Sequence, residues 1–261
     1  MQGALEVFLA SNILAFMLTF ARVGTAMMIM PGVGDSFVPE RIRLYMAVGL
    51  SFVLFPLLLP YMPSPVPAVH YLTMLIGMEV LVGLFIGSIA RIFMGAMDTA
   101  GMIISTQAGL SNAQVFNPSL SSQGSIMGAF LSVTGVVVLF SVNLHHLLIM
   151  AVVESYEFFP LGKLPSAGSM AEMISKTVTA SFMVGVKLAS PFIVMTLIMY
   201  VAMGVLSRLM PQVQVFMIAL PLQIWMSLIL LTLVLTAIFY HWLGHFEEGM
   251  VYFLSNVNSQ N

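Results

Sequence analysis

Charged side chains are scarce in this sequence. Of its 261 residues, 7% are charged and 60% are hydrophobic, whereas a typical soluble domain carries about 25% charged residues. So few charges cannot cover the surface of a soluble protein of this size. Several apolar runs reach the ~20 residues that cross a hydrocarbon layer, and helices satisfy their own backbone hydrogen bonds in lipid. The composition therefore predicts an all-α integral membrane protein.

Cysteine is absent altogether, which excludes disulfides, iron–sulfur clusters and thiolate metal sites. The formal net charge of -2 indicates no nucleic-acid partner and no acidic one. No Lys or Arg precedes the first apolar run, and Glu6 lies where a signal peptide has its positive charges. We therefore expect this run to remain in the mature protein.

What the sequence does contain is a series of apolar runs, which predicts one domain of about six kinked helical segments. Polar or proline-rich stretches separate them: a turn over 31–43 that carries Arg41 and Arg43, a stiff proline linker over 60–67, and a polar segment over 154–175. The run over 70–108 is too long for one crossing, so we expect a kink near 91–95 or two separate helices. The expected spans are 7–30, 44–59, 70–108, 126–153, 177–210 and 213–240.

Motifs of membrane enzymes are missing. The chain has no His-Glu-x-x-His, no set of His boxes and no Gly-x-Ser-x-Gly elbow. The adjacent His145 and His146 point to different faces of a helix, so a hydrogen bond to Asn143 or to a nearby carbonyl is a better reading than a shared metal ion. The sequence thus predicts no enzyme, no metal and no cofactor.

Charges inside the apolar runs need an explanation, because an unpaired charge at the middle of a membrane costs about 2.5–3.5 kcal/mol on insertion scales. In one reading they form ion pairs that fix how helices or subunits meet. In the other they relay ions or protons, as in an ion-coupled secondary transporter. The charges concerned are Arg22, Glu79, Arg91, Asp98, Lys187 and Arg208.

Two pairs of glycines, Gly83 with Gly87 and Gly124 with Gly128, lie one helical turn apart. This spacing is typical of close helix packing in membranes.

Methionine is abundant, at 24 residues. Because a thioether adapts to irregular shapes, Met27, Met28 and Met30 are candidates for a compliant gasket around a constriction. The alternative is that these methionines fill the core.

The stretch over 109–125 is polar yet uncharged, and no charged residue occurs between Asp98 and Glu154. Polar non-helical backbone cannot face lipid, so such a segment must be buried in protein, line an aqueous cavity or lie outside the membrane. Both a re-entrant plug of a pore and a plain surface loop fit the residues.

Motifs along nearly the whole chain are similar to one family. They are Pro39-x-Arg41-x-Arg43, Glu79-x-x-x-Gly83-x-x-x-Gly87, Gln107-x-Gly109-Leu110, Phe116-Asn117-Pro118, Asn143-x-His145, Glu154-Ser155, Pro160-Leu161-Gly162, Lys187-x-x-x-Pro191, Gly204, Ser207-Arg208, Pro211-Gln212, Phe216 and Pro221. On these motifs the chain resembles the FliR family of flagellar type III export-gate proteins, whose injectisome relatives are called SctT. It departs from the family at Asn117, where Asp is frequent, and at Leu144, where Gly is frequent.

The resemblance implies a non-enzymatic channel subunit that assembles with FliP and FliQ, contacts FlhB and membrane lipid, and passes unfolded flagellar proteins. It implies a FliP-like part over 1–176, a FliQ-like hairpin over 177–240 and a short tail over 241–261. The expected location is the bacterial inner membrane at the flagellar basal body, raised toward the periplasmic side. By the same resemblance the plug loop comprises Gly109, Leu110, Ser111, Asn112, Ala113, Gln114, Val115, Phe116, Asn117 and Pro118.

Overall fold

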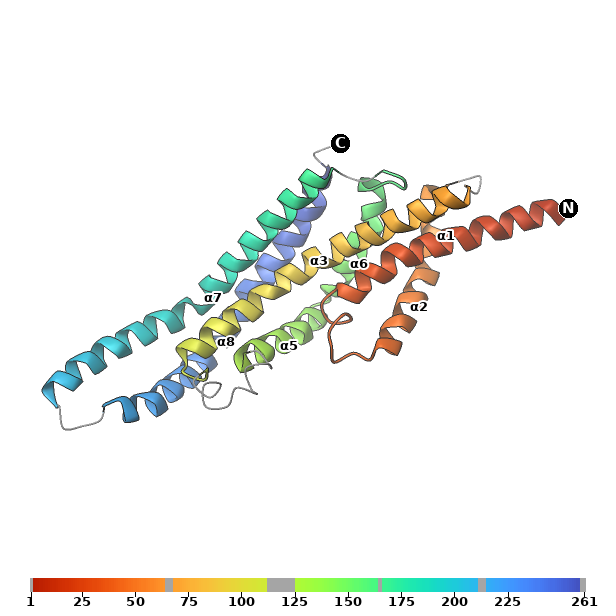
Figure 1. Ribbon diagram of the computed structural model, residues 1–261. Helices are drawn as coiled ribbons and strands as arrows, with labels where there is room; N and C mark the ends of the chain where they lie inside the picture. The colour runs from red at the N-terminus through yellow and green to blue at the C-terminus, as the bar shows by residue number, and fades with distance from the viewer. Residues whose placement is uncertain (1, 64–67, 112–124, 164–165, 211–214, 259–261) are drawn as a thin grey trace. The chain divides into compact units, whose positions relative to one another are not determined.

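The computed structural model describes residues 2–63, 68–111, 125–163, 166–210 and 215–258. Within these residues the chain folds into seven α-helices and one short 3-10 helix, without a strand (Figure 1). The prediction of an all-α protein is confirmed. The elements are α1 (Gln2–Ile29), α2 (Glu40–Leu58), η1 (Leu59–Tyr61), α3 (Val69–Gln107), α5 (Ile126–Ser141), α6 (His145–Phe158), α7 (Ala167–Leu209) and α8 (Val215–Asn258).

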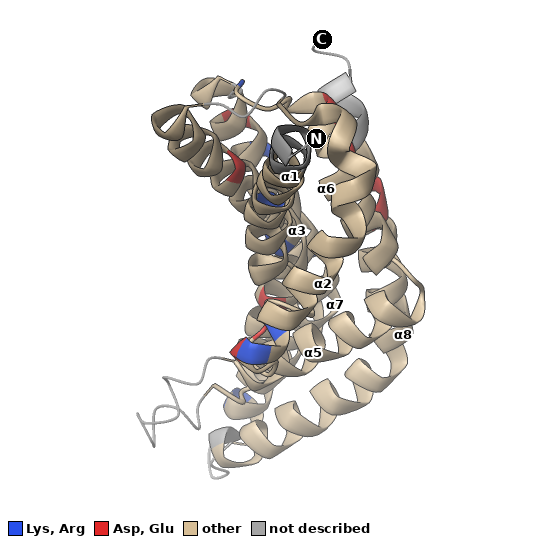
Figure 2. Ribbon diagram, turned by 90° about the vertical axis from the view of Figure 1, so that its right-hand side faces the viewer, with Lys and Arg blue, Asp and Glu red and all other residues tan. Residues whose placement is uncertain are grey.

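Five of these helices, α1, α2, α3, α7 and α8, are long and apolar enough to cross a membrane. The pair α5 and α6 makes a sixth candidate if the two count as one broken span. Figure 2 shows how thinly Lys, Arg, Asp and Glu are distributed over the helices. Long apolar helices without a charged face are unfavourable in water and stable in lipid, so the described part of the chain is typical of a membrane protein.

The helix α2 begins earlier than the sequence suggested. We expected Arg41 and Arg43 in the turn after the first span, but both lie in the first turn of α2. Pro39 sets the start, since its φ of -58° suits the residue that precedes a helix. Glu40 follows in the first turn, where a negative charge interacts favourably with the helix dipole.

The long apolar run over 70–108 forms one continuous helix, α3, of 39 residues. The expectation of two separate helices is therefore wrong. The run contains glycines but no proline, so nothing removes a backbone donor from its hydrogen-bond ladder. At 1.5 Å per residue it is roughly 58 Å long, about twice the thickness of a hydrocarbon core.

The opposite error concerns the run over 126–153, which we expected to be a single segment. It is broken into α5 and α6, which are bent by 79° relative to each other. Asn143 adopts a left-handed conformation with φ of 61° at the break. Asparagine tolerates this conformation better than most residues, which permits a sharp turn inside an apolar sequence.

The last two helices also extend beyond their predicted bounds. The helix α7 begins at Ala167, where the Ser166 hydroxyl accepts a hydrogen bond from the Ser169 amide at 3.2 Å and caps the helix. The helix α8 continues through 241–258, where we expected a separate tail. Helical spacing explains the continuation, because one face of this part is buried: Trp242, Phe246, Met250 and Phe253.

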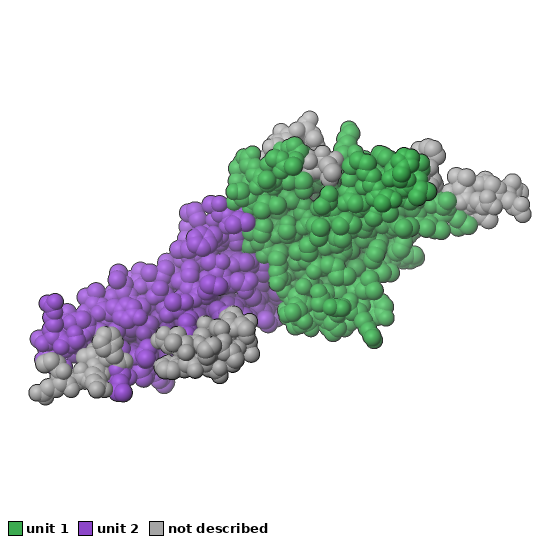
Figure 3. Space-filling model, viewed as in Figure 1, with its two compact units in different colours: residues 1–93, 140–177, 248–261 green, residues 94–139, 178–247 purple. Residues whose placement is uncertain are grey.

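The chain divides into two compact units, drawn in different colours in Figure 3. Unit 1 comprises residues 1–93, 140–177 and 248–261, and unit 2 comprises residues 94–139 and 178–247. The division within α3 falls between Phe93 and Met94. In unit 1, Leu14 and Leu18 of α1 pack with Leu75 of α3.

Candidate functional site

A buried ion pair lies at the centre of unit 1. The Arg22 guanidinium on α1 donates from Nε to Glu79 Oε2 at 2.6 Å and from Nη2 to Glu79 Oε1 at 2.8 Å. Both side chains are only 1% exposed. The contact is bidentate, which is the strongest geometry available to an arginine and a carboxylate. Two charges of the sequence that needed partners thus neutralise each other.

The helix α6 completes the surroundings of Arg22. Nη1 donates to the Ser155 hydroxyl at 3.1 Å, and Nη2 donates to the Phe159 carbonyl at 2.8 Å. The Tyr156 ring lies below the guanidinium, with 3.8 Å between the guanidinium carbon and the ring centroid. Such a cation–π contact adds to the compensation of the charge. Arg22 therefore ties α1, α3 and α6 together at one buried point.

Two glycines on α3 continue this contact with α1. A Cβ atom on Gly83 would overlap Thr25 Oγ1 and the Arg22 carbonyl, and one on Gly87 would lie 2.8 Å from the Ala26 carbonyl. The two backbones therefore approach each other closely at both glycines. Glu79, Gly83 and Gly87 thus lie on one face of α3, against α1.

The partner of Arg91 is a residue that sequence reasoning missed. Arg91 forms an ion pair with Asp35, in the turn between α1 and α2. The other oxygen of Asp35 accepts the Gly32 amide at 2.7 Å. Gly32 has a φ of 90°, so the Asp35 carboxylate stabilises a tight turn in addition to pairing with Arg91. An acidic residue within a Gly-rich turn is the signal that could have identified it.

The remaining charges lie at the surface of unit 2. Asp98 is exposed and accepts a hydrogen bond from the Ser132 hydroxyl. Lys187 and Arg208 are exposed on α7, and no charged residue lies between them. That interval is close to the ~20 residues that a helix needs to cross a hydrocarbon core. Both cations can therefore sit at the borders of a membrane segment rather than in its middle.

The three candidate gasket methionines lie near the end of α1 in different surroundings. Met27 and Met30 are buried in the core, whereas Met28 is 36% exposed. Two of the three thus pack inside the protein, and Met28 alone among them is exposed.

Only the beginning of the candidate plug loop falls in the described part of the chain. Gly109, Leu110 and Ser111 are described; residues 112–118 lie outside the described residues, as does Gly124. The Leu110 amide donates to the Ser105 carbonyl at 3.0 Å, and the Gly109 amide donates to the Thr106 carbonyl at 3.1 Å. With a φ of 76° at Gly109, this is a Schellman motif, and it ends α3.

The far end of the same segment is also fixed to α3. The Ser125 hydroxyl donates to the Gly101 carbonyl at 3.0 Å and accepts the Gly128 amide at 3.0 Å, so it caps α5. A Cβ atom on Gly101 would overlap the backbone of Gly128. The two helices on either side of the loop therefore meet backbone to backbone.

Polar residues within the apolar α7 and α8 complete the arrangement around α3. Thr196, Gln223 and Ser227 are buried, although most of these helices is exposed. Thr196 and Gln223 both donate to the carbonyl of Gln107, which is the last residue of α3. Sequence reasoning missed them, because other hydroxyl side chains such as Ser190 and Thr232 occur along the same two helices and nothing in the sequence distinguishes Thr196 from these.

The histidines form an aromatic stack. The rings of His145 and Phe140 lie 4.9 Å apart at an angle of 12°, and those of His145 and His146 lie 4.2 Å apart. We expected a hydrogen bond to Asn143 or to a nearby carbonyl, but the buried Nδ1 atom of His145 has no hydrogen-bond partner within the described part of the chain. Among the described residues, no three His, Cys, Asp or Glu side chains lie together as a metal site would require.

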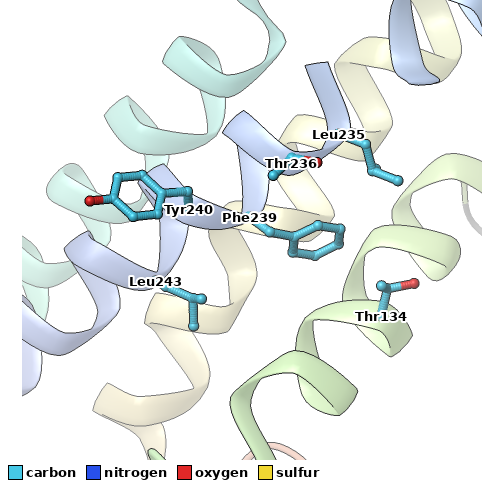
Figure 4. A pocket seen from close by; sticks show the side chains of 6 residues that line it. All are labelled: Thr134, Leu235, Thr236, Phe239, Tyr240 and Leu243. Carbon is cyan, nitrogen blue, oxygen red and sulfur yellow. The ribbon is translucent and has the colours of Figure 1, made fainter. Parts of the chain in front are cut away.

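A groove of about 400 Å³ lies in unit 2 between α5 and α8 (Figure 4). Thr134, Leu235, Thr236, Phe239, Tyr240 and Leu243 line it. The lining carries no charged group, so the groove offers apolar contact and hydroxyls.

Comparison with known proteins matches residues 13–249 to the family described as "Bacterial export proteins, family 1". The chain is 40% identical to the flagellar biosynthetic protein FliR of Caulobacter vibrioides over 246 residues, which cover 94% of this chain and 95% of that protein. It is 31% identical to FliR of Bacillus subtilis over 86% of this chain and 87% of that protein. The Yop proteins translocation protein T of Yersinia pestis is 29% identical over 62% of this chain and 63% of its own length.

The long apolar helices and the buried ion pair define an α-helical membrane protein. Its relatives are named as biosynthetic and translocation proteins. The chain belongs to the FliR family of bacterial export proteins.

Proposed function

We propose that this protein is a channel subunit of the flagellar type III export gate, which assembles with FliP and FliQ into the pore that unfolded flagellar proteins cross. The gate lies in the bacterial inner membrane at the flagellar basal body, raised toward the periplasmic side, and contacts FlhB. The observation that carries the proposal is the 40% identity to a FliR protein over 94% of this chain.

The exposed surface of α7 and α8 supports an assembly. Only 33% of the most apolar segment of α7 and 22% of that of α8 are buried within the chain. Large apolar side chains such as Leu197, Ile198 and Trp225 are exposed there. Surfaces of this kind are covered by lipid or by neighbouring subunits. We assign 177–240 to a FliQ-like hairpin, 1–176 to a FliP-like part and 241–261 to a short tail.

The charged residues fall into two groups, one that is paired inside the chain and one that is exposed for contacts with other subunits. Arg22 and Glu79 satisfy each other inside the chain, which supports a structural role over the proton relay of an ion-coupled transporter. Asp98, Lys187 and Arg208 are exposed and are the candidates for contacts between subunits. Met28, also exposed, is the candidate for a gasket.

The loop that begins at Gly109 is the proposed plug. Its support is the absence of charge from 99 to 153 and the attachment of both of its ends to α3. A segment of this composition is polar enough to sit in a water-filled pore, and its apolar residues such as Leu110 are suited to block it.

The composition of the complex tests the assignment. The protein is extracted from membranes in mild detergent, and native mass measurement gives the mass and identity of its partners. We expect a complex that contains FliP and FliQ and has several times the 28.4 kDa mass of this chain. A stable lone chain that binds and moves an ion would instead establish the transporter.

Deletion of residues 112–116 tests the plug within the full assembly. We expect cells or vesicles that carry the variant complex to leak ions or small solutes, with the complex still assembled. Unchanged permeability at equal complex content would contradict the assignment of this loop. A deletion of equal length in the 60–67 linker is the control.

A further inference from the structure

The carbonyl of Gln107 accepts hydrogen bonds from the side chains of two other helices. It belongs to the last turn of α3, where carbonyl groups have no partner within the helix. The Schellman motif at Gly109 satisfies the carbonyls of Ser105 and Thr106 but leaves that of Gln107. Two side chains from elsewhere in unit 2 supply the missing donors to this carbonyl: the Thr196 hydroxyl donates at 3.2 Å and the Gln223 amide donates from Nε2.

The two donors come from different helices, Thr196 from α7 and Gln223 from α8. Each is only 2% exposed. A carbonyl oxygen has two lone pairs and can accept both bonds at once. In the dry interior of a membrane protein an unsatisfied carbonyl is costly, which makes this shared contact hard to break without a replacement.

The contact differs from three exposed hydroxyl bonds of the two helices. Ser190 and Ser207 on α7 and Thr232 on α8 donate to carbonyls of their own helix three residues earlier, and these side chains are exposed. Such bonds are local and hold nothing in place beyond their own turn. Thr196 and Gln223 instead reach a residue 89 and 116 positions away in sequence.

We propose that Thr196 and Gln223 are positioning residues that clamp the C-terminal end of α3, and with it the root of the loop at Gly109, onto α7 and α8. The inference rests on the proposed function, because it gives the hairpin a role in placing the plug. A displacement of either helix, for example by a neighbouring subunit, then moves the start of the loop.

Amide hydrogen exchange on the complex extracted from membranes tests the clamp. The reporters are the amides of Ala108, Gly109 and Leu110, which are bonded to carbonyls in the last turns of α3. Gln223→Leu keeps the side-chain size and removes the donor, and Thr196→Val does the same for the hydroxyl. We expect exchange of these amides to rise by about tenfold in the double variant, as expected for losing bonds to a buried carbonyl.

The controls separate a positioning role from general packing. Thr232→Val removes a hydroxyl of α8 that bonds only to Ile229 and is expected to leave the three reporters unchanged. Thr196→Ser keeps the donor and is expected to restore the protection lost in Thr196→Val. Unchanged exchange in the double variant, or an equal rise throughout α7 and α8, would overturn the proposal.

Ion leakage of the same variants addresses the proposed function separately. If the reporters exchange faster and the membrane leaks, both the clamp and the plug are supported. If the reporters exchange faster in a sealed membrane, the clamp stands and the plug assignment fails.

Discussion

Glu79→Gln is the substitution that tests the centre of unit 1 most directly. It keeps the size and shape of the side chain but removes the negative charge that Arg22 contacts through two hydrogen bonds. The amide nitrogen of Gln would face a guanidinium nitrogen, so one of these two bonds must be lost. Arg22 would keep its bonds to Ser155 and Phe159, neither of which supplies a charge.

The expected loss follows from the burial of the pair. Since both side chains are 1% exposed, the guanidinium charge has no access to water in the variant. Breaking a buried ion pair by removing one partner costs about 3–5 kcal/mol, and total stabilities of domains are about 5–15 kcal/mol. We therefore expect Glu79→Gln to lose a large part of the stability of the protein.

Reversible unfolding in detergent micelles, followed by circular dichroism, measures the effect. The double variant Arg22→Met with Glu79→Leu is expected to regain most of the loss, because apolar residues of similar volume can replace a buried pair at little cost. The control is Glu172→Gln, which breaks an exposed pair with Lys176 on α7 and is expected to have no measurable effect.

Two results would refute this reasoning. One is a Glu79→Gln protein as stable as the parent, which would mean that the pair is hydrated or protonated. The other is normal stability and assembly combined with lost export, which would assign Glu79 to a relay.

Two further substitutions test other contacts within unit 1. Gly83→Ala is expected to destabilise the protein by about 1–3 kcal/mol, because the added methyl group overlaps α1. The control Gly77→Ala on the same helix meets open space and should stabilise the protein by up to about 1 kcal/mol. Equal effects of the two variants on thermal unfolding would contradict the close approach of α3 to α1. Asp35→Asn is expected to lower the free energy of unfolding by about 1–2 kcal/mol, because its bonds to Arg91 and Gly32 become weaker. If this decrease is not smaller at high salt, the charge of Arg91 is not involved.

Local patterns predicted most of the fold, and the errors have identifiable causes. The helix α7 starts ten residues before the predicted 177, since a polar first turn capped by Ser166 is helical without being apolar. The bend at Asn143 was missed because apolar residues continue on both sides of it. The left-handed conformation belongs to a single residue, and the hydropathy of the sequence does not depend on backbone dihedral angles.

The sequence by itself determined that this is a helical membrane protein, since charge is too scarce for any other class, and that its intramembrane charges need partners. The motifs also sufficed to identify the family. Only the tertiary structure decided the pairings: Arg22 with Glu79, 57 residues apart, and Gln107 with Thr196 and Gln223. Hydrophobic periodicity reports which face of a helix is buried, whereas the choice of partner depends on which faces meet and where the end of a helix leaves a carbonyl unsatisfied.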